Sequence, residues 1–248
     1  LLLRGAPPQG AELDGNLLLD AVFGAEVRWC TPEGYRDRDA TMDAIAAELA
    51  AAGEVPYGVP EGGSNGLGAA AFAAAGQELA DQAADAGVSF EAVLCGVGSG
   101  GTLAGLAMAG LDARVLGVAV CDDAATFRRR VGEIGAQAEA HGLTLPAWGP
   151  QTWDVLEGFQ GPGYARTTPD ALRAQVALAR ETGLLLDPVY TGKTWLALEA
   201  LIARGALTGP VLFWHTGGAF GLFGRGGEIA AALGPGLAQQ GVVAHGEG

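Results

Sequence analysis

Strand-like and helix-like segments alternate along almost the whole chain, and this alternation restricts the possible folds more than any other feature. Short apolar runs are followed by segments whose apolar residues recur at helical spacing. Such repeated units predict an α/β fold with open, mostly parallel twisted sheets that carry helices on both faces. The predicted strands are residues 1–3, 26–30, 90–98, 113–123, 184–190 and 209–218. The predicted helices are residues 17–25, 39–52, 69–86, 102–111, 124–142, 171–183 and 193–205.

Three further predictions concern the cap of the first helix, an irregular segment and the C-terminal tail. Asn16 precedes the first helical segment, and we expect its side chain to cap that helix. Residues 150–168 show no regular period and are expected to be irregular. The tail after Phe223 is rich in Gly and Ala, so we expect it to be flexible, with residues 244–248 frayed.

The charge balance and the cysteine pattern exclude several classes of protein. The chain has 14 Lys+Arg against 28 Asp+Glu, a formal net charge of −14, which argues against a nucleic-acid or anionic-membrane surface. Cys30, Cys95 and Cys121 form no CxxC pair and the histidines no HxxxH spacing, so no disulfide framework or metal site is expected. Without signal-peptide features or an apolar stretch of about 18 residues, a cytoplasmic protein is expected.

Four glycine-rich spots follow predicted strands or begin predicted helices, at residues 61–66, 96–101, 190–193 and 215–218. Ligands of parallel sheets bind at the carboxyl ends of the strands. Four loops that converge on one edge of the sheet therefore predict a binding site there, although any single glycine also suits a plain turn.

The loop at residues 96–101 has the features of a phosphate site. It connects a strand to a helix, and its backbone N–H groups and the positive helix end attract anions, with hydroxyls from Ser99 and Thr102 nearby. The type of phosphate stays open from spacing alone. Gly96, Gly98 and Gly101 match GxGxxG, and Asp122 and Asp123 end the next strand, so a dinucleotide is a rival ligand. A non-catalytic phosphate-binding module is a further alternative.

Two other spacings suggest hydrolase or dehydrogenase chemistry, but each departs from the motif of that enzyme class. Ser64 lies in a GxSxG segment, with Asp187 and His215 following in the hydrolase order, but prolines precede it where a buried strand is needed. Tyr190 and Lys193 are three residues apart, whereas short-chain dehydrogenases pair Tyr and Lys at a spacing of four.

Five segments together resemble one enzyme family: VPEGGSNGLGA, GVGSGGTLAGLA, GPGYARTTPDAL, LLLDPVYTGKTWLALEALI and GPVLFWHTGGAFGLF. They are similar to the D-cysteine desulfhydrase and 1-aminocyclopropane-1-carboxylate deaminase family, pyridoxal-phosphate enzymes with the tryptophan-synthase-β type fold (fold type II). The resemblance runs from residue 1 to about residue 224. It implies that residues 1–54 belong to a small α/β domain and residues 55–248 to a large cofactor-binding domain.

The resemblance implies a role for each matching residue. The cofactor phosphate would be bound by Gly98, Ser99, Gly100, Gly101 and Thr102. Ser64 and Asn65 would border the cofactor, and residues 215–218, including Thr216 and Gly217, would close the ring side. Tyr164 and Tyr190 would face the substrate, where a phenol can orient it or exchange protons.

One position separates the two branches of this family. Thr191 would lie near the pyridine nitrogen, where the deaminases carry Glu and the desulfhydrases Thr. A neutral hydroxyl leaves that nitrogen unprotonated and the ring a weaker electron sink, which favours β-elimination. Two departures leave the specificity open: Phe220 stands where the family usually has Pro, and Ala165 where Gly is usual.

Two family motifs do not occur in the sequence. The lysine that binds the cofactor aldehyde lies in a GGNK-type segment, and the serine that meets the substrate lies in a QSN motif. The chain begins with Leu1, so we expect an N-terminally truncated chain that is inactive by itself. Lys193, the only lysine, is not expected to replace the missing one, because the YTGK lysine of the family does not hold the cofactor.

The resemblance implies a pyridoxal-phosphate-dependent lyase of amino-acid metabolism. Its preferred reaction converts D-cysteine, or a similar small amino acid, to pyruvate, ammonia and sulfide. Deamination of 1-aminocyclopropane-1-carboxylate is the nearest alternative, and a dinucleotide-dependent oxidoreductase the rival of another class. The full-length protein would form a homodimer.

Overall fold

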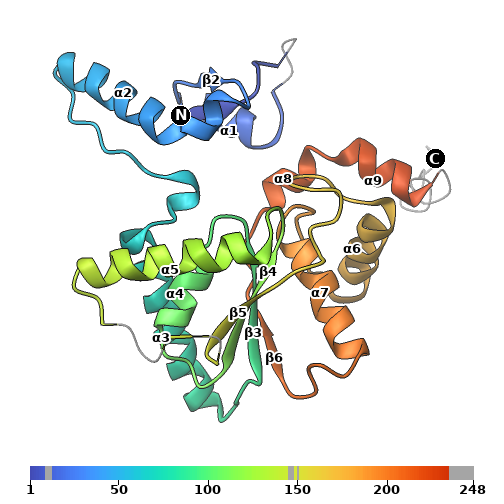
Figure 1. Ribbon diagram of the computed structural model, residues 1–248. Coiled ribbons are helices and arrows are strands. Elements are labelled where there is room, and N and C mark those ends of the chain that lie inside the picture. The colour runs from blue at the N-terminus through green and yellow to red at the C-terminus, as the bar shows by residue number, and fades with distance from the viewer. Residues whose placement is uncertain (9–12, 145–147, 150, 235–248) are drawn as a thin grey trace, which may run out of the picture. The chain divides into compact units, whose positions relative to one another are not determined.

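The computed structural model describes residues 1–8, 13–144, 148–149 and 151–234 (Figure 1). The chain divides into two compact units, Leu1–Glu61 and Gly62–Gly248. The assignment of residues 1–54 and 55–248 to two domains of the family stays a prediction. The expected fraying at residues 244–248 falls outside the described residues.

The first unit is a small βαβ arrangement. Strands β1 (Leu2–Arg4) and β2 (Arg28–Cys30) are parallel, and helix α1 (Gly15–Val22) connects them. A short 3-10 turn η1 (Gly34–Asp37) leads into α2 (Arg38–Ala51). Arg28 Nη1 donates to Glu48 Oε2 at 2.7 Å, which joins β2 to α2.

The first helix begins earlier than its sequence pattern predicts. Asp14 has an extended backbone, and its carboxylate accepts a hydrogen bond from the Gly15 N–H at 2.6 Å. Asn16 lies inside the first turn, so the expectation that Asn16 caps this helix is wrong. Both residue types cap helices well, and the extended backbone decides between them.

The second unit contains a four-stranded parallel sheet in the order β5-β4-β3-β6. The chain builds the sheet outward from β3 through β4 to β5 and then returns to the other side of β3 for β6. The strand order therefore reverses between β3 and β6, and a crevice forms at such a switch point beyond the carboxyl ends of the strands. The strands are β3 (Ala92–Val97), β4 (Arg114–Ala119), β5 (Trp153–Leu156) and β6 (Val211–Phe213).

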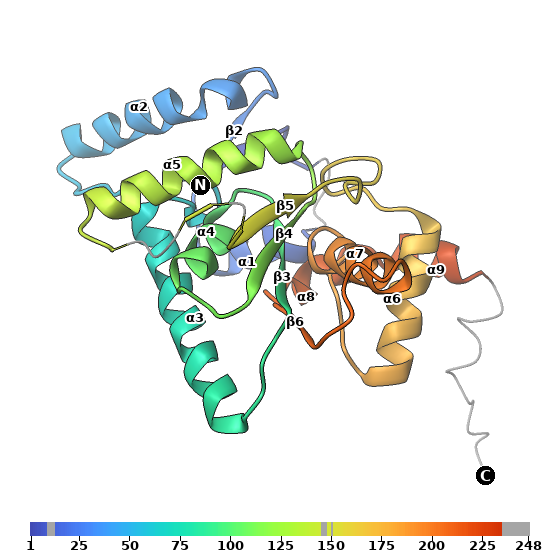
Figure 2. The same ribbon diagram turned by 60° about the horizontal axis from the view of Figure 1, so that its bottom comes forward.

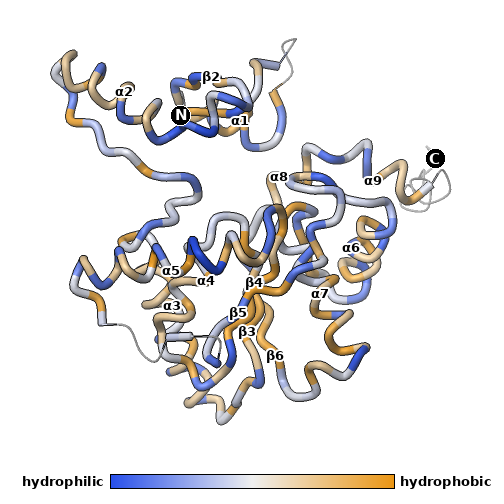
Figure 3. Tube along the Cα trace, in the orientation of Figure 1, coloured by the Kyte–Doolittle hydropathy of each residue, from blue (hydrophilic) through white to orange (hydrophobic). Residues whose placement is uncertain are grey.

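Helices cover both faces of this sheet (Figures 1 and 2). On one face pack α3 (Gly66–Ala86), α4 (Gly101–Met108) and α5 (Ala124–Ala140), and on the other pack α6 (Pro169–Thr182) and α7 (Thr191–Ala203). Alternate residues of β3 serve the two cores: Val93 and Cys95 face the first set of helices, and Leu94 faces α7. Figure 3 shows the resulting apolar centre.

Three predictions about the second unit need correction. Residues 184–190 form a loop and not a strand, because the Asp187 carboxylate binds N–H groups that a sheet would need. Residues 150–168 are not wholly irregular, since they contain β5. The tail after Phe223 contains α9 (Gly226–Leu233), which packs on α6, and the short α8 (Ala219–Phe223) precedes it.

The described helices include none that is long and apolar enough to cross a membrane. In the same part of the chain, the Cys, His, Asp and Glu side chains form no group that could hold a metal ion. The 3-10 turn η2 (Glu61–Gly63) lies where the two compact units meet in the sequence.

Candidate active site

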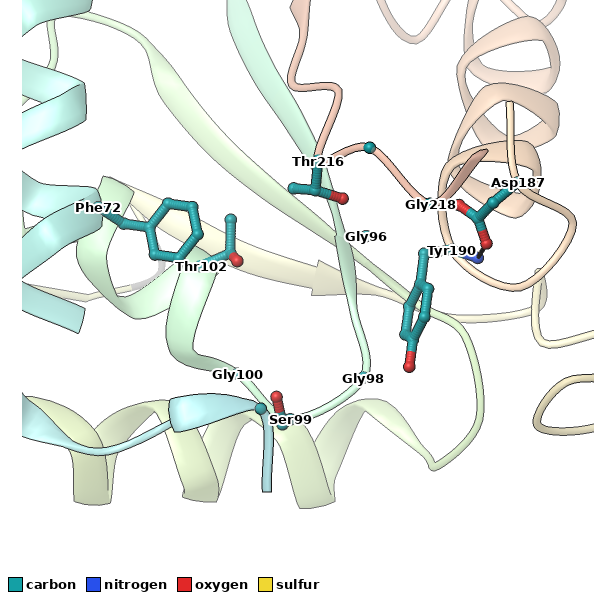
Figure 4. A pocket seen from close by; sticks show the side chains of 12 residues that line it. Phe72, Gly96, Gly98, Ser99, Gly100, Thr102, Asp187, Tyr190, Thr216 and Gly218 are labelled. Carbon is teal, nitrogen blue, oxygen red and sulfur yellow. Dashed lines mark hydrogen bonds between the residues drawn. The ribbon is translucent and has the colours of Figure 1, made fainter. Parts of the chain in front are cut away.

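A cavity of about 280 Å³ lies at the carboxyl ends of β3 and β6, where the strand order reverses (Figure 4). Segments that are far apart in the sequence contribute to its wall. Figure 4 shows Phe72 and Thr102 on one side of the cavity and Tyr190 and Asp187 on the other. The lining residues are Gly62, Phe72, Gly96, Gly98, Ser99, Gly100, Thr102, Asp187, Tyr190, Thr216, Gly217 and Gly218.

The loop between β3 and α4 forms one end of the cavity. Gly100 caps α4 with φ +104°, a left-handed conformation that favours glycine. The Ser64 hydroxyl accepts a hydrogen bond from the Gly101 N–H at 3.1 Å and lies 2.6 Å from the Ser99 hydroxyl. The start of α4 thus brings the Ser99 and Thr102 residues and the positive end of the helix dipole to the cavity, while Ser64 occupies the Gly101 N–H.

The glycines of this loop are required by close packing. A Cβ atom on Gly98 would lie 2.7 Å from Tyr190 Cε1, and one on Gly101 would lie 2.7 Å from Ser64 Oγ. A Cβ atom on Gly62 would lie 2.5 Å from Ser99 Oγ. Side chains at these positions would displace the cavity wall, so the open space depends on bare backbone.

The chemistry of this end of the cavity fits a phosphate group. The lining residues include no Lys or Arg, so the compensation for an anion comes from N–H groups, hydroxyls and the helix dipole. Ser99 and Thr102 supply the hydroxyls. Pyridoxal phosphate has both a phosphate and a ring for the remaining space, and this loop would hold its phosphate.

Tyr190, on the wall opposite Phe72 and Thr102, meets a second tyrosine, Tyr164 (Figure 4). The Tyr164 and Tyr190 hydroxyls lie 2.8 Å apart, and their rings pack edge to face with centroids 6.1 Å apart. Burial, followed by the hydrogen bond with Tyr164, raises the pKa of Tyr190 well above its ordinary value. Tyr190 therefore keeps its proton at neutral pH and can share it with the neighbouring phenol.

A buried carboxylate organises the loop that carries Tyr190. Asp187 accepts hydrogen bonds from the N–H groups of Val189, Tyr190 and Thr191, each at 2.8 Å. The Thr191 hydroxyl donates to Asp187 Oδ1 at 2.7 Å, and Thr191 is only 2% exposed. Asp187 thereby satisfies the first N–H groups of α7 and orients the tyrosine backbone.

The loop after β6 forms the third part of the wall. His215 Nε2 lies 2.8 Å from the Leu185 carbonyl oxygen, and His215 Nδ1 accepts from the Gly217 N–H at 3.0 Å. A Cβ atom on Gly218 would lie 2.7 Å from Asp187 Cβ. These contacts bring the backbone of Thr216 and Gly217 to the cavity.

The hydrolase interpretation does not match these contacts. Ser64 pairs with Ser99, His215 with the Leu185 carbonyl, and Asp187 with the start of α7, so the three groups do not form a relay. The acid expected for a ribose is also engaged, because Asp122 pairs with Arg130 at 3.2 Å.

The structure brings together most of the residues that the resemblance implies. Seven of them line the cavity, and Gly101 and Ser64 are hydrogen-bonded directly behind Ser99. The other three lie elsewhere: Tyr164 contacts Tyr190, Asn65 caps α3 through a 2.8 Å bond to Gly68 N–H, and Thr191 is buried against Asp187. Those that line the cavity are Gly98, Ser99, Gly100, Thr102, Tyr190, Thr216 and Gly217.

Sequence reasoning missed one lining side chain, Phe72, and gave another, Asp187, a different role. Phe72 sits on α3 in an Ala-rich helix, where nothing local marks it as a site residue. Asp187 was named only for the hydrolase interpretation, although an acid before Pro-Val-Tyr-Thr-Gly is well placed to cap the next helix.

The model of the pyridoxal-phosphate dependent enzyme family matches residues 4–217 of the chain. The chain belongs to this family. The family assignment confirms the predicted α/β fold and the predicted cofactor, pyridoxal phosphate, and removes the dinucleotide interpretation.

Individual relatives narrow the position within the family. A putative 1-aminocyclopropane-1-carboxylate deaminase of Thermotoga maritima is 37% identical over 219 residues, which cover 86% of this chain and 68% of the relative. A D-cysteine desulfhydrase of Yersinia pestis is 39% identical over 218 residues, which cover 85% of this chain and 64% of the relative. The chain therefore spans about two thirds of the length of these relatives.

A solved structure supports the same placement. The crystal structure of an ACC deaminase homologue superposes with a TM-score of 0.81 at 30% identity, covering 93% of this chain and 69% of the other. The fold derived from the strand pattern is thus the fold of this homologue.

Proposed function

We propose that the chain carries the cofactor-phosphate and substrate-facing part of a pyridoxal-phosphate-dependent lyase that acts on a small amino acid. One observation carries the proposal: the glycine loop at the start of α4 and Tyr190 line the same cavity at the switch point of the sheet. When bound, the cofactor supplies an electron sink for bonds at the substrate α-carbon.

Each part of the wall has a task in this proposal. Gly98, Ser99, Gly100 and Thr102 bind the phosphate through N–H groups and hydroxyls, and Gly101, whose N–H is held by Ser64, completes the loop. The backbone at Thr216 and Gly217 borders the ring. Ser64 supports the phosphate loop through its contact with the start of α4, and Asn65 caps α3 next to it. The Tyr164–Tyr190 pair orients the substrate and holds a proton beside it.

The preferred reaction is β-elimination from D-cysteine or a similar amino acid, which releases pyruvate, ammonia and sulfide. Thr191 supports this branch. Its neutral side chain is buried beside the Asp187 carboxylate, so a glutamate at this position would place two like charges in contact. We assign Thr191 to the neighbourhood of the pyridine nitrogen, with its hydroxyl held by Asp187.

Deamination of 1-aminocyclopropane-1-carboxylate is the second candidate, because relatives with that name match as much of the chain. A substrate comparison separates the two. In a form of the protein that also contains the lysine that binds the cofactor aldehyde, and with pyridoxal phosphate present, we expect sulfide and pyruvate from D-cysteine. A four-carbon 2-oxo acid from the cyclopropane substrate alone would assign the deaminase. A cytoplasmic homodimer completes the proposal.

Phosphate binding is tested most sharply by Thr102→Asp. This residue is at the second position of α4, where an aspartate suits the helix dipole and leaves the fold intact. Its carboxylate would nevertheless repel a phosphate. We expect Thr102→Asp to weaken binding of pyridoxamine 5′-phosphate at least about tenfold, measured by calorimetry, because like charges in a cavity oppose each other strongly.

The probe and the control make this result specific. Pyridoxamine 5′-phosphate has no aldehyde and cannot react with a lysine, so the titration reports the phosphate loop itself. Ala125→Asp is the matched control: it adds the same charge at the second position of α5, at an exposed residue outside the cavity lining. An equal loss of affinity for pyridoxamine 5′-phosphate in the two variants, or no loss in either, would refute the assignment of this loop to the cofactor phosphate.

A further inference from the structure

The single lysine of the chain has its ammonium group inside the protein. Lys193 lies in the first turn of α7 and is only 3% exposed. Its Nζ donates to the carbonyl oxygens of Val120 at 2.9 Å, Gln160 at 2.7 Å and Gly163 at 2.7 Å. An ammonium has three protons, so these three bonds use its full donor capacity.

The partners of this ammonium are neutral carbonyls. In the part of the chain that the structure describes, Lys193 forms no salt bridge, and Asp187 and Arg225 act on it through their charges. Burial lowers the pKa of Lys193, as expected for a cation taken out of water. Rings of backbone carbonyls that replace a hydration shell are typical of monovalent-cation sites.

The three carbonyls join segments that build the active site. Val120 follows β4, whereas Gln160 and Gly163 belong to the loop that leads directly to Tyr164. The Gln160 side chain makes a second tie, since its Nε2 donates to the Asp122 carbonyl at 3.1 Å. The loop before Tyr164 is therefore bound to the carboxyl end of β4 at two points.

Lys193 also shares its element with the second tyrosine. Tyr190 immediately precedes α7, and Lys193 lies in the first turn of that helix. The start of α7 thus presents Tyr190 to the Tyr164 hydroxyl and, one turn away, an ammonium to the carbonyl of the residue before Tyr164.

We propose that the carbonyls of Val120, Gln160 and Gly163 form a monovalent-cation site that the Lys193 ammonium fills as a tethered cation, and that this contact positions Tyr164 against Tyr190. Lys193 is then a positioning residue. The importance of the tyrosine pair for catalysis rests on the proposed function, whereas the cation site does not. The same contacts explain why Lys193 is not the lysine that binds the cofactor aldehyde, because its ammonium is enclosed outside the cavity lining.

A pair of variants tests the proposal without cofactor. Lys193→Ala removes the ammonium and its stem and leaves room for a small cation, whereas Lys193→Met removes the charge but keeps most of the stem in place. We expect hydrogen exchange of residues 158–166 to rise about tenfold or more in both, the change that matches loss of one bond to a charged donor.

Rescue distinguishes a cation site from simple packing. Ammonium or potassium chloride should restore slow exchange in Lys193→Ala but not in Lys193→Met. Tetramethylammonium chloride at the same ionic strength should restore slow exchange in neither variant, because this cation is too large to reach the three carbonyl oxygens. Absence of rescue by the small cations, or equal rescue by all three salts, would overturn the cation site.

The wild-type protein offers a second measurement that does not depend on folding of a variant. Because Lys193 is the only lysine, labelling with ζ-15N-lysine gives a signal from this ammonium alone. We expect a visible NH3⁺ signal at pH 7 with slow solvent exchange; exchange as fast as that of free lysine would contradict the enclosed cation. Neither measurement involves phosphate. A failure of the phosphate-loop test would therefore leave the cation site standing, and a failure of the cation-site tests would leave the phosphate loop standing.

Discussion

At the scale of single residues, the least favourable backbone lies next to Tyr164. Among the described residues, Ala165 is the only non-glycine residue with a positive φ, +55°. Its carbonyl accepts a hydrogen bond from the Arg225 guanidinium, and Tyr164 precedes it. Backbone strain of this kind is tolerated where the surrounding contacts hold the segment in place.

Ala165→Gly should therefore increase stability. An L-residue in the left-handed region costs about 1–2 kcal/mol, and the extra freedom of glycine in the unfolded chain offsets about 0.4–1 kcal/mol of the gain. We expect the free energy of unfolding in urea to rise by about 0.5–1 kcal/mol. Ala74→Gly, at an exposed position inside α3, is the control and should lower it by about 1 kcal/mol. A loss of stability in both variants would contradict the strain at Ala165.

At the scale of elements, the edge strand β5 is held by charge as well as by the sheet. Asp154 accepts from Arg128 Nε of α5 at 2.8 Å and lies 3.6 Å from Arg114 Nη2 at the start of β4. Partial burial raises the pKa of Asp154, but the hydrogen bonds from Arg128 and from the Val155 N–H lower it more, so the net shift is downward.

Asp154→Asn should lower the free energy of unfolding by about 1–2 kcal/mol at pH 7, because Arg128 and Arg114 lose their negatively charged partner. A carboxyl with a lowered pKa stabilises the fold fully above its ordinary pKa of 3.8 and loses this contribution as the pH falls through the folded value. The difference between wild type and variant in urea should thus shrink below about pH 4. The control is Asp170→Asn, which removes an exposed carboxylate paired with Arg173. It should change the free energy of unfolding little at any pH.

At the scale of the whole molecule, all residues that line the cavity belong to the second compact unit. Residues 54–60, which precede it, contain no helix or strand, and Val55 and Tyr57 are 96% and 73% exposed. Exposed segments without regular structure are the preferred sites of proteolysis.

Limited digestion with chymotrypsin should accordingly yield a stable fragment that begins at Gly58. We expect this fragment to bind pyridoxamine 5′-phosphate as the intact chain does, measured by calorimetry after N-terminal sequencing. Tyr57→Ala should delay its appearance. A fragment that accumulates but no longer binds the probe would show that the first unit contributes to the phosphate site.

Local patterns in the sequence determined the features that depend on neighbouring residues. Strand–helix alternation predicts the parallel sheet, and the glycines and hydroxyls at residues 96–102 predict an anion loop, because backbone N–H groups at a helix start do not need distant partners. The motifs up to His-Thr-Gly-Gly place the chain in its family and identify the cofactor.

Only the tertiary structure decided which distant groups meet. The loop at residues 184–190 has an apolar strand pattern, yet the Asp187 carboxylate binds the N–H groups that would join a sheet. The 2.8 Å contact between Tyr164 and Tyr190, and the three carbonyls around Lys193, join residues more than 25 positions apart. Hydrogen bonds of this kind depend on the strand order and on the packing of whole helices, and no local spacing encodes either.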